Sequence, residues 1–197
     1  MNADLRLRLE KILSEPIKST TAVSGGCIAD SRKLELSSGK LFFLKMARRG
    51  NSGMFDSEAQ GLEELAKTSA VRVPEVVAKD SDFLLLEWIE EGNESTDSSM
   101  EQLGFQFTEL HRFGGNKFGF NADNFLGASP QSNTPTSAGT ENWATFYAEN
   151  RLQFQADLAE INGYATPEMR DLLDLLIMKI PELLSGKIGR ASCRERV

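Results

Sequence analysis

The feature that most constrains the fold is a lysine inside an apolar run. Lys45 stands in Leu41-Phe42-Phe43-Leu44-Lys45-Met46, a segment whose composition is typical of a buried strand. A charged side chain in such a strand must either reach water at the strand end or meet a charge of opposite sign. The fold must therefore supply an open edge or an acidic partner at this position.

An acidic candidate lies on the next predicted element, a helix over residues 55–67. Glu58 comes three residues after Phe55 and four before Leu62, so it shares the apolar face of this helix. A carboxylate on a buried face requires a cation, and we predict an ion pair between Lys45 and Glu58. The alternative is a lysine at the end of the strand that extends to water.

Short strands surround this pair. Residues 1–15 have helical spacing of leucines, and strand patterns follow at 20–23, 32–36, 41–46, 76–78 and 83–87, with a hairpin turn at 37–40. Ser24-Gly25-Gly26-Cys27 lies between the first two strands, where glycines would allow the backbone to approach a phosphate group. A plain hairpin turn is the alternative for this segment.

The second half of the chain has helical patterns only. A polar stretch at 90–99 is typical of a linker, and helices are predicted over 100–112, 141–161 and 166–180, where Pro181 bends or ends the last one. Between them, residues 114–140 are rich in Gly, Asn, Ser, Thr and Pro and are predicted to be irregular, with a short hairpin around Phe118 and Phe125. The fold class is therefore α+β, with a small antiparallel-sheet lobe over 1–90 and the beginning of a helical lobe over 91–186.

Composition excludes several other classes of protein. The 197 residues carry 22 Lys+Arg and 29 Asp+Glu, a net charge of −7, which disfavours nucleic acid and anionic membranes as partners. Two distant cysteines, Cys27 and Cys193, argue against a disulfide scaffold or a zinc ribbon. No apolar run approaches the about 20 residues that span a bilayer, and the N-terminus lacks a signal-peptide core. We expect a cytoplasmic location, with an organelle left open.

Residues 187–197 differ in character from the rest. They are basic, and their back-translation resembles a common sequencing-adapter read, so we expect the natural sequence to differ after about Gly186. Without this segment the charge would be 18 − 28 = −10, since four of the 22 basic residues and one of the 29 acidic residues lie in it. Cys193 would then carry no information about the protein.

An ordered set of short segments runs through residues 5–186. The segments are Ser24-Gly25-Gly26-Cys27-Ile28, Phe42-Phe43-Leu44-Lys45, Met54-Phe55-Asp56-Ser57-Glu58-Ala59, Val71-Arg72-Val73-Pro74, Leu86-Glu87-Trp88-Ile89, Leu110-His111-Arg112, Lys117-Phe118-Gly119-Phe120, Trp143-Ala144-Thr145-Phe146-Tyr147, Arg151-Leu152 and Lys179-Ile180-Pro181-Glu182-Leu183. Taken in this order, they resemble the fructosamine-kinase family, also called ketosamine-3-kinases or protein-ribulosamine kinases. The resemblance implies a protein-kinase-like, aminoglycoside-phosphotransferase-like two-lobe fold.

The resemblance implies ATP-dependent phosphorylation of the sugar 3-hydroxyl of ketosamines on glycated proteins or small amines, a deglycation repair step. It also implies a role for each matching residue, and it associates the loop cysteine with redox control. The implied nucleotide-binding residues are Gly25, Gly26 and Cys27 in the phosphate loop, Lys45 and Glu58 as an ion pair, and Glu87 and Ile89 as the adenine hinge, through their backbone groups.

The sequence departs from the family at the catalytic loop. The family continues into His-Gly-Asp-Leu-Trp-x-Gly-Asn and a second metal-binding Asp, which supply the base and the Mg²⁺ ligands. No His-Gly-Asp occurs in this sequence, so we expect the catalytic Asp and the Mg²⁺ ligands beyond residue 186. A truncated chain of this kind is expected to bind nucleotide weakly at most, not to turn over, and to expose apolar helix surface.

Two other functions remain open at this point. One is a small-molecule phosphotransferase of the same architecture that acts on choline or an aminoglycoside. The other is a non-catalytic nucleotide-binding scaffold, which the lack of a catalytic loop would fit.

Overall fold

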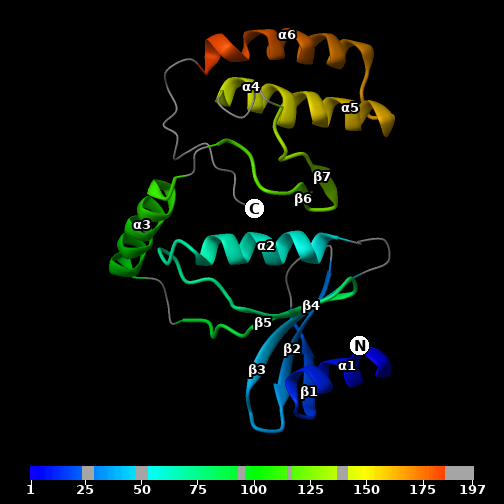
Figure 1. Ribbon diagram of the computed structural model, residues 1–197, viewed down its shortest axis with the longest axis vertical. Helices are drawn as coiled ribbons and strands as arrows, with labels where there is room; N and C mark the ends of the chain where they lie inside the picture. The colour runs from blue at the N-terminus through cyan, green and yellow to red at the C-terminus, as the bar shows by residue number, and fades with distance from the viewer. Residues whose placement is uncertain (24–28, 48–52, 93–95, 115–116, 137–141, 185–197) are drawn as a thin grey trace. The chain divides into compact units, whose positions relative to one another are not determined.

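The computed structural model describes residues 1–23, 29–47, 53–92, 96–114, 117–136 and 142–184. The chain forms two compact units, Met1–Gln106 and Phe107–Val197 (Figure 1). Along the chain, the boundary between the units falls within α3 (Asp97–Arg112). The predicted lobe boundary, after residue 90, lies closer to the end of the sheet. No helix in the described ranges is both long and apolar enough to cross a membrane.

The first unit is built on a five-stranded antiparallel sheet in the order β1-β2-β3-β5-β4. The predicted strands are confirmed, although the first begins earlier than predicted because Ile17 is buried and pairs with Leu36. The strands are β1 (Ile17–Ala22), β2 (Ala29–Leu36), β3 (Leu41–Ala47), β4 (Val76–Lys79) and β5 (Phe83–Glu87).

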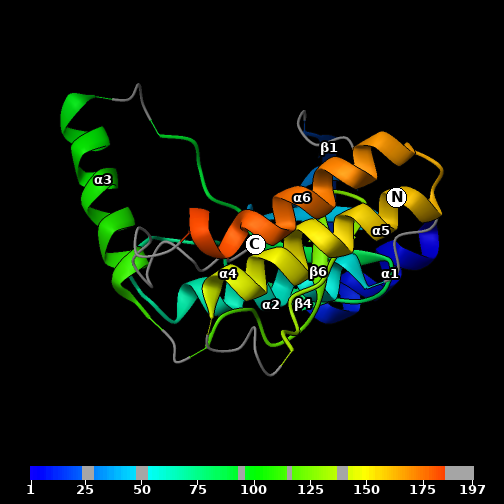
Figure 2. The same ribbon diagram turned by 90° about the horizontal axis from the view of Figure 1, so that it is seen from above.

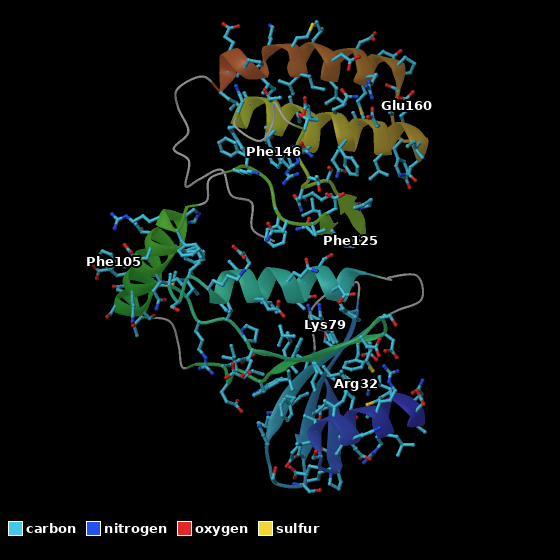
Figure 3. All side chains as sticks on the ribbon, in the orientation of Figure 1. Arg32, Lys79, Phe105, Phe125, Phe146 and Glu160 are labelled. Atoms are coloured by element: carbon cyan, nitrogen blue, oxygen red, sulfur yellow. The ribbon has the colours of Figure 1, made fainter. Side chains whose placement is uncertain are left out.

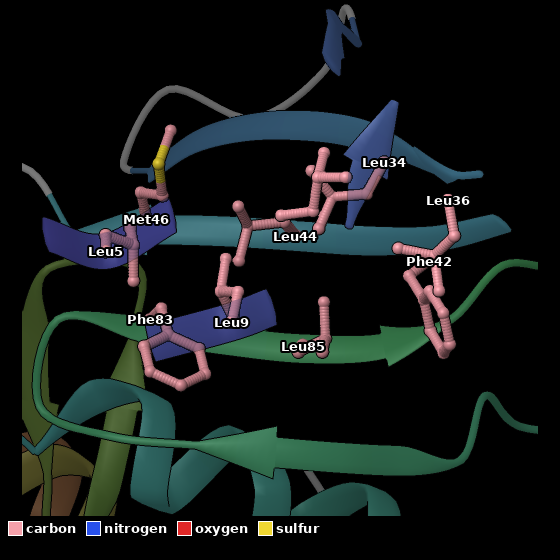
Figure 4. Packing of buried hydrophobic residues seen from close by; sticks show 10 residues of the cluster. Leu5, Leu9, Leu34, Leu36, Phe42, Leu44, Met46, Phe83 and Leu85 are labelled. Atoms are coloured by element: carbon pink, nitrogen blue, oxygen red, sulfur yellow. The ribbon is translucent and has the colours of Figure 1, made fainter. Parts of the chain in front are cut away.

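One face of this sheet is covered by α1 (Ala3–Leu13). Asn2 caps the helix by accepting a hydrogen bond from the Leu5 amide at 2.8 Å. Leu5 and Leu9 then pack on side chains of β2, β3 and β5, among them Leu34, Leu44 and Phe83 (Figure 4). Arg8 ties the helix to the turn between β4 and β5 through ion pairs with Asp80 at 2.7 Å and Asp82 at 2.9 Å.

The other face is covered by α2 (Met54–Ala66), so the two helices lie on opposite sides of the sheet (Figure 1). Phe55 and Ala59 are buried against Leu84 and Leu86 of β5. Because β5 is covered on both faces, its residues from Phe83 to Leu86 are all buried, and its sequence is a continuous apolar run rather than an alternating one.

α3 has no buried residue, although its sequence is amphipathic. His111, the single histidine of the sequence, lies beside Leu110 on an apolar helical stripe, which predicts a hydrogen-bonded core histidine, with a catalytic one as the alternative. In the structure His111 is exposed, and its Nδ1 lies 2.7 Å from the Phe107 carbonyl oxygen. The prediction of a core histidine was wrong, because helical spacing identifies an apolar stripe without identifying what covers it.

The second unit contains a short hairpin and two helical layers. The hairpin, β6 (Asn124–Leu126) with β7 (Ser129–Gln131), contains Phe125 but not Phe118. The predicted helix over 141–161 is α4 (Trp143–Tyr147), a π-helical turn η1 (Ala148–Gln153) and α5 (Phe154–Ile161). α6 (Pro167–Leu183) runs alongside these helices (Figure 2).

α6 differs from its prediction at its end and leaves an apolar surface uncovered. The helix continues past Pro181 to Leu183, and the Leu184 amide still donates to the Ile180 carbonyl at 2.9 Å. The predicted exposure of apolar helix surface is confirmed, since Leu172 is 67% exposed and Met178 is 70% exposed.

A polar cluster around the buried Asn133 holds the segment 117–136 against α4 and η1. The Arg151 guanidinium donates to Asn133 Oδ1 at 2.7 Å and stacks 4.8 Å from the Phe146 ring centre. The Asn133 amide donates to Asp123 Oδ1 at 2.7 Å. Phe146 projects from α4 toward this segment (Figure 3). Arg151 therefore has a structural role in this unit that its sequence position did not indicate.

Candidate functional site

The site begins with the lysine of β3. Alternation along the strand places Phe43 and Lys45 on the face of the sheet that α2 covers, beside Leu86 and Leu84 of β5. Lys45 Nζ lies 2.5 Å from Glu58 Oε1 on α2, so the predicted ion pair is present. Both side chains are about one-quarter exposed (28% and 24%), which leaves the pair accessible from one side.

A cavity of about 400 Å³ opens over this ion pair. Its volume falls within the range of small-molecule sites, roughly 300–1,000 Å³, and its wall is mostly apolar with a few charged groups, as in such sites. The wall consists of Val23, Phe43, Lys45, Glu58, Leu62, Pro74, Leu86, Glu87, Trp88, Ile89 and Glu91.

The cavity has two chemically different ends. Lys45 pairs with Leu84 in the sheet register and Phe42 pairs with Glu87, so the two positions are three residues apart on β3. At about 3.3 Å per residue this separation is about 10 Å. One end therefore presents an ammonium group, and the other is lined by the end of β5 and the residues that follow it.

The Glu87 carboxylate accepts hydrogen bonds from the segment that precedes β4. Arg72 Nη2 donates to Glu87 Oε1 at 2.6 Å, and the Glu75 amide donates to Oε2 at 3.3 Å. The hydrogen bond from Arg72 and that from the Glu75 amide hold the pKa of Glu87 below its ordinary value. This carboxylate is thus ionised and engaged at neutral pH.

Trp88 and Ile89, which follow Glu87, also line the cavity. The Trp88 ring lies 6.3 Å from the Phe43 ring centre, and the Lys33 ammonium stands 4.4 Å from the Trp88 ring centre. The Ile89 amide makes no hydrogen bond within the described part of the chain. Ile89 lines the cavity, so its amide is a candidate main-chain donor for a ligand there.

Four of the predicted site residues come together in this cavity: Lys45, Glu58, Glu87 and Ile89 all line it. The other three, Gly25, Gly26 and Cys27, lie outside the described residues. The roles assigned to all seven in nucleotide binding stay predictions.

Sequence reasoning missed several residues of the cavity wall. Pro74 lines the wall, whereas Arg72 lies outside it and pairs with the wall residue Glu87. Both occur in a segment that carried the family resemblance, as Trp88 does, yet nothing in the sequence assigned them a chemical role. For Glu91, the position shortly after β5 was the only signal.

The described residues do not fit a protein-built metal centre. Among them, no group of three or more His, Cys, Asp or Glu side chains lies close enough together to hold a metal ion. The Glu58 carboxylate is already paired with Lys45, which leaves it poorly suited to ligate Mg²⁺ as well.

Comparison with known sequences gives consistent matches. The model of the family described as fructosamine kinase matches residues 2–190. A probable ketoamine kinase of Synechocystis sp. is 34% identical over 176 residues, which cover 87% of this chain and 56% of the relative. A chloroplastic protein-ribulosamine 3-kinase of Arabidopsis thaliana is 34% identical over 145 residues, 70% of this chain and 42% of the relative. The chain spans about half the length of these curated relatives.

Solved structures resemble the chain over nearly all of its length. A Thermobifida fusca protein assigned as a fructosamine-3-kinase superposes with a TM-score of 0.79 at 25% identity, covering 96% of this chain and 65% of that one. The complex of gentamicin with APH(2″)-IIa, an aminoglycoside phosphotransferase, gives a TM-score of 0.56 at 14% identity and covers 96% and 61%. The second likeness concerns the fold alone. Together they confirm the predicted protein-kinase-like fold class.

Proposed function

Because the chain belongs to the fructosamine kinase family, we propose that its cavity binds ATP as the phosphoryl donor for a ketosamine acceptor. The observation that carries this proposal is the Lys45–Glu58 ion pair at one end of the cavity, with Glu87, Trp88 and Ile89 lining the other. A cation fixed by a carboxylate suits the phosphate groups of a nucleotide, and exposed backbone amides and carbonyls suit the edge of a purine.

Each residue of the cavity has a separate task in this proposal. The Lys45 ammonium neutralises α- and β-phosphate oxygens, and Glu58 holds that ammonium in position. The Glu87 carbonyl and the Ile89 amide bind the adenine edge through the backbone. Gly25, Gly26 and Cys27 are proposed as the phosphate loop on the strength of their position between the first two strands.

The proposed reaction is phosphoryl transfer to the sugar 3-hydroxyl of a ketosamine on a glycated protein or small amine. The acceptor oxygen forms a bond to the γ-phosphorus, the bond from that phosphorus to the β,γ-bridging oxygen breaks, and ADP leaves. The hydroxyl proton passes to a base that we expect outside this sequence, as we expect for the Mg²⁺ ligands. Loss of the phosphorylated sugar then frees the amine, which makes the reaction a deglycation step.

The reaction is proposed for the whole protein, because the chain spans about half the length of its relatives. This chain alone is proposed to bind nucleotide without turnover, since it contains no His-Gly-Asp segment. A cytoplasmic location stays a prediction, and the Arabidopsis relative is named as chloroplastic.

One other candidate is a nucleotide-binding scaffold without catalysis. The lack of a His-Gly-Asp segment within the 197 residues would fit it, but the adapter-like residues 187–197 explain that lack better. Sequencing the transcript beyond codon 186 separates the two candidates. A downstream His-Gly-Asp supports the kinase, and a natural stop codon at that point supports the scaffold.

The kinase proposal is tested on the full-length gene product with ATP and fructosyl-lysine. Lys45→Met removes the phosphate-binding cation, and kcat/KM is expected to fall about 100-fold or more. Lys18→Met serves as the control, because Lys18 forms an exposed ion pair with Glu35 on β1 and β2, away from the cavity. Unchanged turnover in the Lys45 variant would contradict the role of this lysine.

A further inference from the structure

The segment before β4 is fastened to the end of β5 at three points. Arg72 Nη2 donates to Glu87 Oε1 at 2.6 Å, and the Glu75 amide donates to Glu87 Oε2 at 3.3 Å. In the opposite direction, the Glu87 amide donates to the Glu75 carbonyl at 2.9 Å. We call this set of contacts the Glu87 bracket. One carboxylate thus joins two stretches of chain, 72–75 and 87–89.

Both of these stretches belong to the wall of the cavity. Pro74 lines it from the first, and Trp88 and Ile89 line it from the second. The other side of the second stretch is held by β2 and β3, because Lys33 and Phe43 contact the Trp88 ring. The bracket therefore adds to the pairing of β4 with β5 in holding these backbone groups with respect to Pro74.

We propose that Glu87 is a positioning residue for the purine base, whose carboxylate, held by Arg72 and by the Glu75 amide, sets the place of the Glu87 carbonyl and the Ile89 amide. This inference rests on the proposed nucleotide function of the cavity. It gives the Glu87 side chain a task distinct from that of its backbone, and it gives Arg72 a task in ligand binding without contact to the ligand.

Charge provides a sharp distinction between positioning and simple electrostatics. Removing Arg72 takes away a positive charge and would weaken the binding of an anion, whereas removing the Glu87 charge would strengthen it. If Glu87 acts by positioning, both changes weaken ATP binding, because either one removes the ion pair between Arg72 and Glu87. The double variant should lose no more ATP affinity than the weaker-binding single variant, since the second change removes a contact that the first has already broken.

The experiment measures the affinities of the chain for ATP and for inorganic tripolyphosphate by titration calorimetry. Arg72→Met and Glu87→Gln are compared with the double variant. The control is Lys18→Met, because the Lys18–Glu35 pair has the same 2.6 Å distance and closely similar exposures (60% and 32%, against 68% and 36% for Arg72 and Glu87). All four variants change exposed ion pairs, so they are expected to keep the wild-type melting temperature within a few degrees.

A second readout comes from Trp88. The chain has two tryptophans, and a Trp143→Phe background leaves Trp88 as its only indole fluorophore. The quenching of Trp88 by ATP then reports the base end of the cavity directly.

Each bracket variant is expected to weaken ATP binding about three- to fivefold, to reduce the quenching of Trp88 at a given ATP concentration, and to leave tripolyphosphate binding unchanged. Lys45→Met is expected to weaken the binding of both ligands.

The outcomes separate this inference from the proposed function. If the wild-type chain binds ATP and Lys45→Met weakens that binding, but the bracket variants bind ATP as wild type does, the inference is overturned and the proposed function stands. The inference would also be overturned if one bracket variant bound ATP more tightly and the other more weakly, or if the affinity for tripolyphosphate fell as much as that for ATP. A wild-type chain that does not bind ATP would overturn both.

Discussion

Gly119 shows how closely single residues are constrained in the second unit. Its φ is +88°, and a Cβ at this position would overlap the Asn133 carbonyl oxygen and lie 3.1 Å from the Phe146 ring. Gly119→Ala is therefore expected to lower the free energy of unfolding by about 2 kcal/mol or more, measured by urea denaturation.

The matched control for this change is Gly163→Ala. Gly163 also has a positive φ, +71°, but a Cβ there would meet nothing within 4 Å. Only the left-handed backbone penalty applies to it, about 1 kcal/mol. Equal losses at the two glycines would contradict the close packing around Gly119.

Glu10 makes the junction of α1 and β1 sensitive to acid. A hydrogen bond from the Ile17 amide at 2.9 Å, and then one from Arg6, hold the pKa of Glu10 below its ordinary value. A lowered folded-state pKa means that its stabilisation is present above the unfolded pKa, about 4.3, and is lost as pH falls through the folded value.

Glu10→Gln is accordingly expected to lower the free energy of unfolding at pH 6 and to lose this difference from wild type toward pH 3. Urea denaturation at a series of pH values measures it. Glu63→Gln, at an exposed position on α2, serves as the control for the removal of one carboxylate. A difference for Glu10→Gln that stays constant with pH would contradict the assignment.

At the same scale, the site was predictable only in part. The Lys45–Glu58 pair followed from the sequence because a charge in an apolar strand and a carboxylate on an apolar helix face each require a partner. The partnership of Arg72 with Glu87, 15 residues apart, did not follow, because two exposed charges have many possible partners until the fold selects one.

Among the elements, α1 covers the face of the sheet opposite to α2. Leu9 is fully buried there, whereas Leu7 on the same helix is 67% exposed. Leu9→Ala is expected to lower the free energy of unfolding by about 2–5 kcal/mol through lost burial and a residual cavity. Leu7→Ala is expected to change it by less than about 0.5 kcal/mol. Similar small effects for both would show that α1 is not packed as described.

The elements themselves were largely predictable, since strand alternation and helical spacing identified the sheet, α1, α2, α3 and α6. Features that depend on more than the apolar pattern of one element could not be predicted. The π-helical turn η1 keeps the apolar period of a helix, so residues 141–161 gave no sign of it. The burial of β5 on both faces, by contrast, was visible as an unbroken apolar run.

At the scale of the whole molecule, the exposed apolar surface of α6 predicts self-association. Leu172 and Leu175 are 67% and 52% exposed. Replacing both by Gln is expected to reduce light scattering on concentration while leaving the melting temperature unchanged. Ile180→Gln, at a position only 5% exposed, should lower the melting temperature instead. Scattering that does not respond to the double change would exclude this surface as the cause.

The central claim is that one cavity of the first unit holds a nucleoside triphosphate with its base toward Ile89 and its phosphates toward Lys45. A crystal structure of the chain with a non-hydrolysable ATP analogue tests it most directly. The account predicts the purine edge within hydrogen-bond distance of the Ile89 amide and a phosphate oxygen within that distance of Lys45 Nζ. An analogue bound elsewhere, or bound in this cavity with its phosphates away from Lys45, would contradict it.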